Sequence, residues 1–171
     1  MSVEEHRARA PKHLAVGVIT ASNTRTEETD DSGQYAQEAL RDAGHKVAFY
    51  AVVRDDPREI REALDAALPQ ASVVIVSGGT GLSPTDVTIE TIAPLLQKEI
   101  DGFGEIFRAL SYEEIGTPAM LSRATAGVID GKLVACLPGS PEAVRLAMEA
   151  LLLPELGHIV EQITSGPHGH P

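Results

Sequence analysis

Residues 73–81 read Val73-Val74-Ile75-Val76-Ser77-Gly78-Gly79-Thr80-Gly81, a short apolar run that passes directly into a loop with three glycines. An uninterrupted apolar run suits a strand that is covered on both faces of a parallel sheet. Glycines at the end of such a strand let backbone amides approach an anion closely, and open α/β sheets place ligands at the carboxyl ends of their strands. The stretch predicts a buried strand that ends in either an anion-binding loop or a tight turn without a ligand.

Two strand–helix units precede this stretch. An apolar run at 14–19 leads through a polar loop to a helix for which Asp31 or Ser32 can serve as N-cap. A second apolar run at 47–53 leads to a helix capped by Asp56, with a proline at its first position. Three such units in succession indicate a parallel α/β sheet with right-handed crossovers.

The pattern after the glycine loop is less regular. A helix is expected to begin between residues 86 and 88, and a later helical stretch carries Phe103 and Phe107, with a second helix start at Ser111. This stretch is also a candidate oligomer contact, because its phenylalanines could form an apolar patch. The dipeptide Asp130-Gly131 predicts a hairpin turn, and further on Pro154 should interrupt a helix that begins near residue 141. We therefore expect a three-layer α-β-α fold of the Rossmann-like kind, with a mostly parallel sheet and one antiparallel strand.

Composition bounds the class of protein. The 171 residues suit one domain, which we place at 13–164 between a flexible segment at 1–12 and a flexible tail at 165–171. A net charge of −11 argues against binding to nucleic acid or to an anionic membrane surface. The single cysteine, Cys136, lies in an apolar run and is expected to be a buried small hydrophobe. The N-terminus resembles neither a signal peptide nor a membrane anchor, so we expect a cytoplasmic protein.

The glycine loop belongs to neither of the two common nucleotide-binding motifs. No Gly-Lys-Ser or Gly-Lys-Thr follows it, which excludes a Walker loop, and Pro84 stands where a dinucleotide motif would need its third glycine. A hydride-transfer function is therefore disfavoured.

Carboxylates are expected beside this loop. Asp86 lies near the predicted helix start, where it could cap the helix or hold a magnesium ion. Asp55 follows the preceding strand in sequence and should reach the same rim of the sheet; because Asp56 is the better cap, Asp55 is the candidate for chemistry. Two carboxylates beside free amides suit metal-assisted phosphoryl or nucleotidyl transfer.

Other polar segments should reach the same rim. The turn Pro138-Gly139-Ser140 opens a helix and could bind a second phosphate. The first strand delivers Ser22, followed further on by Ser32 and Gly33. By contrast, His168 and His170 lie two residues apart in a Gly/Pro-rich tail, and we expect no metal site there.

These motifs together resemble the MoaB/Mog family of molybdenum-cofactor biosynthesis proteins from Val16 to about Ile159. The resemblance rests on seven segments of the chain. They are Ile19-Thr20-Ala21-Ser22-Asn23, Asp31-Ser32-Gly33, Ser77-Gly78-Gly79-Thr80-Gly81, Asp86-Val87-Thr88-Ile89-Glu90, Met120-Leu121-Ser122-Arg123, Ala126-Gly127 and Leu137-Pro138-Gly139-Ser140-Pro141. The segments Gly102–Arg108 and Ser111–Gly116 are similar to the MoaB branch more than to the Mog branch.

The resemblance implies an adenylyltransferase that transfers AMP from magnesium-ATP to molybdopterin, giving adenylylated molybdopterin and pyrophosphate. It implies that Asp86 holds Mg²⁺ and that Asp55 helps to position the metal–phosphate assembly. It further implies a homotrimer or homohexamer, and the protein that inserts molybdate is a candidate partner. The residues implied in binding substrate or phosphate are Ser22, Ser32, Gly33, Gly78, Gly79, Thr80, Gly81, Ser122, Arg123, Pro138, Gly139 and Ser140.

One departure keeps two alternatives open. Many relatives carry a basic residue immediately before the loop aspartate, and this chain has Thr85. The first alternative is a non-catalytic molybdopterin-binding or scaffold protein. The second is a nucleotide pyrophosphatase like that of CinA proteins, whose loop resembles Gly79–Asp86, although the segment Gly102–Gly116 disfavours it.

Overall fold

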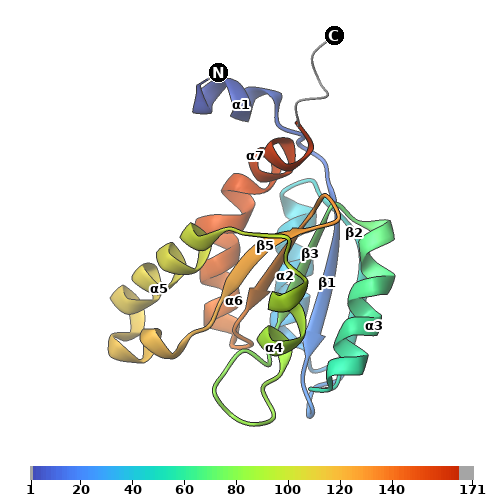
Figure 1. Ribbon diagram of the computed structural model, residues 1–171, viewed down its shortest axis with the longest axis vertical. Coiled ribbons are helices and arrows are strands. Elements are labelled where there is room, and N and C mark those ends of the chain that lie inside the picture. Colours follow the sequence, from blue (N-terminus) through green and yellow to red (C-terminus); the bar gives the residue numbers. More distant parts are fainter. Residues whose placement is uncertain (1, 166–171) are drawn as a thin grey trace.

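The chain folds around one six-stranded sheet, shown by a computed structural model that describes residues 2–165 (Figure 1). Its strands are β1 (Ala15–Ala21), β2 (Lys46–Val53), β3 (Val73–Ser77), β4 (Lys98–Glu99), β5 (Thr125–Ile129) and β6 (Lys132–Leu137), in the order β2-β1-β3-β6-β5-β4. The strands β2, β1, β3 and β6 are parallel, and β5 is antiparallel to both of its neighbours. The predicted mixed sheet with one antiparallel strand is therefore confirmed. The two-residue strand β4 was not predicted.

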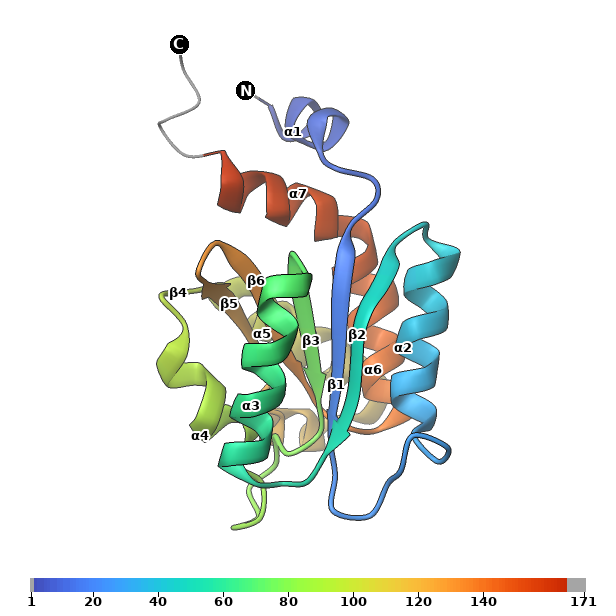
Figure 2. The same ribbon diagram turned by 90° about the vertical axis from the view of Figure 1, so that its right-hand side faces the viewer.

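Helices cover both faces of the sheet and make three layers (Figure 2). They are α1 (Val3–Arg9), α2 (Asp31–Asp42), α3 (Pro57–Ala67), α4 (Thr88–Ile92), α5 (Asp101–Ile115), α6 (Pro141–Ala147) and α7 (Leu153–Thr164), with the short turns η1 (Leu68–Gln70), η2 (Ala93–Leu95), η3 (Thr117–Leu121) and η4 (Met148–Leu152). Helices α2, α5, α6 and α7 pack on one face, and α3 and α4 pack on the other. Among the described residues, no helix is long and apolar enough to cross a membrane.

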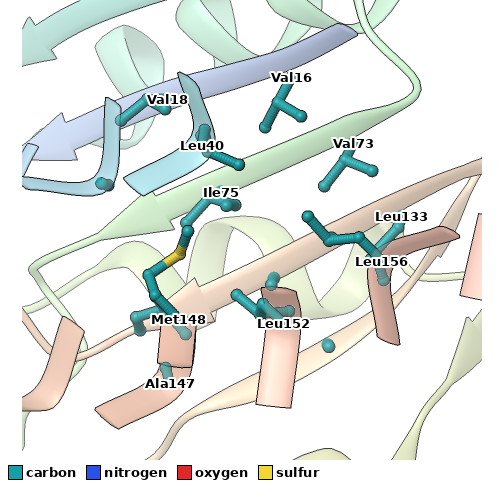
Figure 3. Packing of buried hydrophobic residues seen from close by; sticks show 14 of the residues in the cluster. Val16, Val18, Leu40, Val73, Ile75, Leu133, Ala147, Met148, Leu152 and Leu156 are labelled. Carbon is teal, nitrogen blue, oxygen red and sulfur yellow. The ribbon is translucent and has the colours of Figure 1, made fainter. Parts of the chain in front are cut away.

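The central strands are buried on both sides, as their continuous apolar sequence predicted. Val16 and Val18 of β1 face the layer that contains Leu40, Met148 and Leu152 (Figure 3), whereas Ile19 faces α3 and α4. Cys136 is buried in that second core, and burial raises the pKa of its thiol to about 12. It is a small hydrophobe, as expected, and not a reactive thiolate.

Local sequence signals fixed most element ends. The Asp56 side chain accepts hydrogen bonds from the backbone of Arg58 and Glu59 at the start of α3, and Asp130 and Gly131 adopt positive φ angles in the β5–β6 turn. Two expectations were wrong. The N-cap of α2 is Asp30 and not Asp31 or Ser32, and α5 runs through Ser111 without a second start, because that residue is buried on the helix face that packs inward.

Helix α1 lies against α7, away from the carboxyl ends of the central strands (Figure 1). Residues 3–9, for which the sequence predicted a flexible segment, form the capped helix α1 on α7, where Arg7 forms an ion pair with Glu155. The expected interruption at Pro154 takes the form of the π-helical turn η4, after which this proline fits the first turn of α7. Of the predicted tail at 165–171, all residues after Ser165 lie outside the described part of the chain.

Candidate functional site

The loop that follows β3 is held in a conformation that requires glycine. Gly78 and Gly79 have φ angles of +89° and +66°, and a Cβ atom on Gly78 would overlap the carbonyl oxygen of Ala21 at the end of β1. Thr88, at the start of α4, fastens the loop from the other side: its Oγ1 donates to the Gly78 carbonyl at 2.8 Å and its backbone N–H donates to the Gly79 carbonyl at 2.9 Å. The loop therefore has a fixed shape before any ligand binds.

The backbone amides of this loop are available to a ligand. Within residues 2–165, the N–H groups of Gly79, Thr80 and Gly81 donate no hydrogen bond to the protein, although the carbonyl of Gly79 accepts one from Thr88. Successive free amides at the end of a buried strand form a concave site for an anion. The anion-binding alternative for the glycine loop is therefore favoured over a turn without a ligand.

Asp86 borders the loop and does not cap the following helix. Its Oδ2 accepts a hydrogen bond of 3.1 Å from the Ser83 backbone and lies 2.6 Å from the position that a Cβ atom on Gly81 would take. The N-cap position of α4 is Val87, and no side chain caps the helix. Of the two roles that the sequence left open for Asp86, helix capping is excluded.

Asp55 places a partly dehydrated carboxylate against the same loop. Its backbone N–H donates to Oδ1 of Asn23 at 2.9 Å, and its own Oδ1 lies 3.0 Å from the Cβ position of Gly79. Within the described chain, this Oδ1 is buried and accepts no hydrogen bond. Burial raises the pKa of the Asp55 carboxyl, the backbone of Asn23 opposes that shift, and the charge of Asp86 adds to it. A buried carboxylate oxygen without a hydrogen-bond donor is unfavourable, and a bound cation would compensate its charge.

Arg123 supports the glycine loop by donating hydrogen bonds to two of its carbonyls. Its Nε donates to the Thr80 carbonyl at 3.0 Å and its Nη2 donates to the Gly81 carbonyl at 2.6 Å. The guanidinium also forms an ion pair with Glu90, and this hydrogen bond lowers the pKa of the Glu90 carboxyl. The contact that the sequence predicted between Arg123 and substrate stays a prediction, whereas its contacts in the structure are with the glycine loop.

The glycine loop forms one wall of a cavity of about 370 Å³, which we call the main cavity. The site residues predicted from sequence that line it are Gly78, Gly79, Thr80, Gly81, Asp86, Ser122, Pro138, Gly139 and Ser140. The opposite wall is largely apolar and comes from α5 and η3, with Phe107, Ser111, Ile115, Pro118, Ala119 and Leu121. An aromatic or heterocyclic ring would lie against such a wall while its polar groups face the loop.

The sequence did not predict this apolar wall. Phe103 and Phe107, expected to form an exposed patch, are buried at 7% and 1% exposure because α5 packs both against the sheet. The exposed apolar residues of this region are instead Ile106, Tyr112, Ile115, Met120 and Leu121.

The remaining predicted residues lie on the loop between β1 and α2, which carries Ser22, and in the first turn of α2, which carries Ser32 and Gly33. Ser32 is fully buried and donates to the Gly139 carbonyl at 2.8 Å. Gly33 packs against the Asp30 carboxylate, so close that any Cβ atom would overlap it. Ser22 accepts hydrogen bonds from the backbone of Thr24 and Arg25. Asn23, Arg25 and Asp30 were not predicted; the only signal was that Arg25 is the one cation in a loop rich in hydroxyls and carboxylates.

Comparison with known proteins gives a consistent picture. The sequence profile of a family described as "Probable molybdopterin binding domain" matches residues 17–158, a range that contains every residue lining the main cavity. Molybdenum cofactor biosynthesis protein B of Bacillus cereus is 53% identical over 166 residues, covering 95% of this chain and 98% of the relative. A solved structure of a molybdenum cofactor biosynthesis protein B matches with a TM-score of 0.86 at 52% identity, covering 91% of this chain and 98% of the other. The tungsten cofactor synthesizing protein MoaB from Pyrococcus furiosus matches with a TM-score of 0.83 at 42% identity, covering 90% and 99%.

Proposed function

Since the chain belongs to the MoaB/Mog family of molybdenum-cofactor biosynthesis proteins, we propose that it is a magnesium-dependent adenylyltransferase that acts on molybdopterin. An oxygen of the pterin phosphate attacks the α-phosphorus of ATP and forms a new P–O bond. The bond from that phosphorus to the oxygen it shares with the β-phosphate breaks, and pyrophosphate leaves with the bonding electrons. The products are adenylylated molybdopterin and pyrophosphate.

The observation that carries this proposal is the buried, unpartnered Oδ1 of Asp55 beside the free amides of the glycine loop. Mg²⁺ prefers oxygen ligands and is usually bound by one or two carboxylates together with substrate phosphates and water. Asp55 and Asp86 supply two carboxylates, and residues 2–165 contain no cluster of three or more metal-binding side chains. This donor set fits a magnesium ion that arrives with ATP, and it does not fit a permanent structural metal.

Each part of the site has a separate task in the proposed reaction. The amides of Gly79, Thr80 and Gly81 bind phosphate oxygens, and Arg123 keeps the loop carbonyls turned away from them. Asp86 and Asp55 would hold Mg²⁺, which when bound screens the phosphate charges and polarises the reacting phosphorus. The apolar wall that includes Phe107 takes up a ring of one substrate and keeps water out. Holding the two phosphates in line accounts for much of the expected rate.

Self-association is part of the proposal. Five apolar side chains of α5 and η3 are exposed, and two of them also line the main cavity. The five are Ile106, Tyr112, Ile115, Met120 and Leu121, and those at the cavity are Ile115 and Leu121. Exposed apolar groups at this density indicate a protein–protein contact. We therefore propose a homo-oligomer, with the trimer and the hexamer as its two forms, to be distinguished by light scattering.

A second candidate function is a protein that binds molybdopterin without adenylylating it. Thr85 favours it, because this residue is exposed and hydrogen-bonds only to Ser83 in the described chain, where a basic residue could steady a triphosphate. In this alternative the fold and the main cavity bind the pterin, and the two carboxylates have no catalytic task.

One assay separates these functions. The protein is incubated with molybdopterin, ATP and Mg²⁺, and both adenylylated pterin and pyrophosphate are measured. We expect both products from the wild type, at least a hundredfold less from Asp86→Ala, in line with the loss of an electrostatic catalytic group, and near wild-type amounts from the exposed control Asp65→Ala. Pterin binding without products would establish the scaffold function. Cleavage of ADP-ribose without pterin would establish the pyrophosphatase.

A further inference from the structure

A second, smaller pocket adjoins the main cavity. It is formed by Thr20, Ala21, Ser22, Thr24, Arg25, Gly78 and Gly139, has a volume of about 230 Å³, and is here called the Arg25 pocket. It shares Gly78 and Gly139 with the main cavity. The Cβ position of Gly139 lies 3.1 Å from Cα of Gly78, so these two glycines form a thin ridge between the two spaces. The two pockets therefore share a boundary that carries no side chains.

Arg25 supplies the only ionisable side chain that lines this pocket. One of its terminal nitrogens, Nη1, donates to Oγ of Ser32 at 3.1 Å and to the Gly139 carbonyl at 3.2 Å. Within the described residues its Nε and Nη2 donate no hydrogen bond, and the side chain is 32% exposed. The guanidinium is thus held in place through one nitrogen while its other donors remain available to a ligand.

The carboxylate nearest to Arg25, that of Asp30, already accepts hydrogen bonds from other residues. Asp30 is fully buried, with its Oδ1 3.9 Å from Nη1 of Arg25. It accepts hydrogen bonds from Oγ1 of Thr20 at 2.7 Å, from the hydroxyl of Tyr50 at 2.7 Å and from the Gly33 backbone at 3.0 Å. Asp30 does not line the pocket. Its negative charge attracts the Nη1 end of the guanidinium, while the donors at Nε and Nη2 remain available to a ligand.

We propose that the Arg25 pocket is a subsite for a substrate phosphate group that binds without a metal ion. In the main cavity, Asp55 and Asp86 repel a bare phosphate until a cation is present. In the Arg25 pocket the only charged lining group attracts it, and a guanidinium with two free donors matches the geometry of phosphate oxygens. The hydroxyls of Ser22 and Thr24 offer further donors. This inference rests on the proposed function in one respect, namely that both substrates carry phosphate.

The experiment titrates inorganic phosphate into Mg²⁺-free protein and measures binding by calorimetry. Thr24 lines the pocket but is exposed. Among the residues that the structure describes, its side chain makes only one hydrogen bond, a long one of 3.4 Å with Ser22. Thr24→Glu and Thr24→Gln have the same size and differ only in charge, so they form a matched pair. We expect Thr24→Glu to bind phosphate at least about tenfold more weakly than Thr24→Gln, which corresponds to about 1.4 kcal/mol.

A second pair tests the arginine itself. Arg25→Gln should also lose at least about tenfold in phosphate affinity, whereas Arg58→Gln, which removes an exposed charge at the start of α3, should bind as the wild type does. Circular dichroism and the melting temperature show whether Arg25→Gln keeps its fold. Equal phosphate affinity in the two Thr24 variants, or wild-type affinity in a folded Arg25→Gln protein, would overturn the proposal.

Adding Mg-ATP identifies the source of the phosphate. If phosphate and Mg-ATP bind at the same time, the pocket takes the phosphate of the pterin substrate; if they compete, it takes a phosphate of the nucleotide. The phosphate titration needs neither Mg²⁺ nor turnover, so it can succeed even if no adenylylated product forms. Failure of the proposed function and failure of this subsite are therefore distinguishable.

Discussion

Replacing Asp55 with asparagine should stabilise the metal-free protein. Oδ1 of Asp55 is buried without a hydrogen-bond partner, and burial raises the pKa of this carboxyl, opposed by the backbone of Asn23 and reinforced by Asp86. At neutral pH the folded protein therefore holds an ionised carboxylate at a cost that an amide of the same shape avoids. Both side chains leave the buried oxygen without a partner, but an unpaired charge costs more to bury than an unpaired neutral amide. Because Asp55 is only half-buried as a residue, we expect Asp55→Asn to raise the free energy of unfolding by about 1 kcal/mol, or Tm by about 2–4 °C.

The pH dependence of this gain has a definite sign. Folding raises the pKa of Asp55, so between the unfolded and folded pKa values the native state binds more protons than the unfolded state, and the contribution of this group to stability falls as the pH rises. The unfolded pKa of an aspartate is about 3.9. The advantage of Asp55→Asn should be complete at pH 7, shrink as the pH falls through the folded pKa, and disappear below about pH 3.9.

Urea unfolding at pH 7 and pH 5 measures both the gain and its pH dependence. The exposed control Asp65→Asn should change stability by less than about 0.5 kcal/mol at either pH. Mg²⁺ with ATP should stabilise the wild type more than Asp55→Asn, because the variant has lost a ligand for the ion, and its adenylyl transfer should fall. A folded Asp55→Asn protein that is no more stable than the wild type at pH 7 would refute the idea that this carboxylate is held at a cost for function.

Three further perturbations test the parts around the site. Gly78→Ala should lower the free energy of unfolding in urea by at least about 2 kcal/mol, because φ at this position is positive and the new Cβ atom would overlap the Ala21 carbonyl. In the control Gly102→Ala, the new Cβ atom meets open space in α5, so the protein should be unchanged or more stable by up to about 1 kcal/mol. Arg123→Ala should speed hydrogen exchange at the hydrogen-bonded amides of Ser83, Thr85 and Asp86. It should also lower the free energy of unfolding by about 1–2 kcal/mol, because two loop carbonyls lose their donor. Unchanged exchange at these amides would show that the loop does not need Arg123. Burial raises the pKa of Glu155, but hydrogen bonds from His158 and Arg7 outweigh this effect and hold the pKa below its usual value. The packing of α1 on α7 should therefore be stable above about pH 4.3 and weaken as the pH falls through the folded pKa. Amide chemical shifts of α1 should show this transition in the wild type and not in Glu155→Gln.

The sequence predicted the fold well where the signals are local. The continuous apolar runs of β1 and β3, the cap at Asp56 and the turn at Asp130-Gly131 each depend on a few neighbouring residues, and all are found in the structure. The errors lie where tertiary contacts outweigh a local signal. Ser111 carries a capping-box spacing, yet it lies in the middle of α5 because that face of the helix is buried against the rest of the protein.

In the candidate site, too, the residues with local sequence signals were predicted and the residue that depends on long-range contacts was not. Asp55 and the glycine loop come shortly after the ends of β2 and β3, and Asp86 comes between that loop and the start of α4. The rule that ligands bind at the carboxyl ends of parallel strands was therefore enough to place them together. Arg25 carries no comparable signal, because its position depends on Asp30, five residues along a loop, and on the Gly139 carbonyl, 114 residues away. This long-range contact is also why Arg25 is important. Arg25 belongs to the loop after β1 and bonds to the turn after β6, so it can hold both segments in a fixed position next to Gly78. A phosphate bound at Arg25 would therefore be fixed relative to the glycine loop by the protein itself, before any metal ion enters the site.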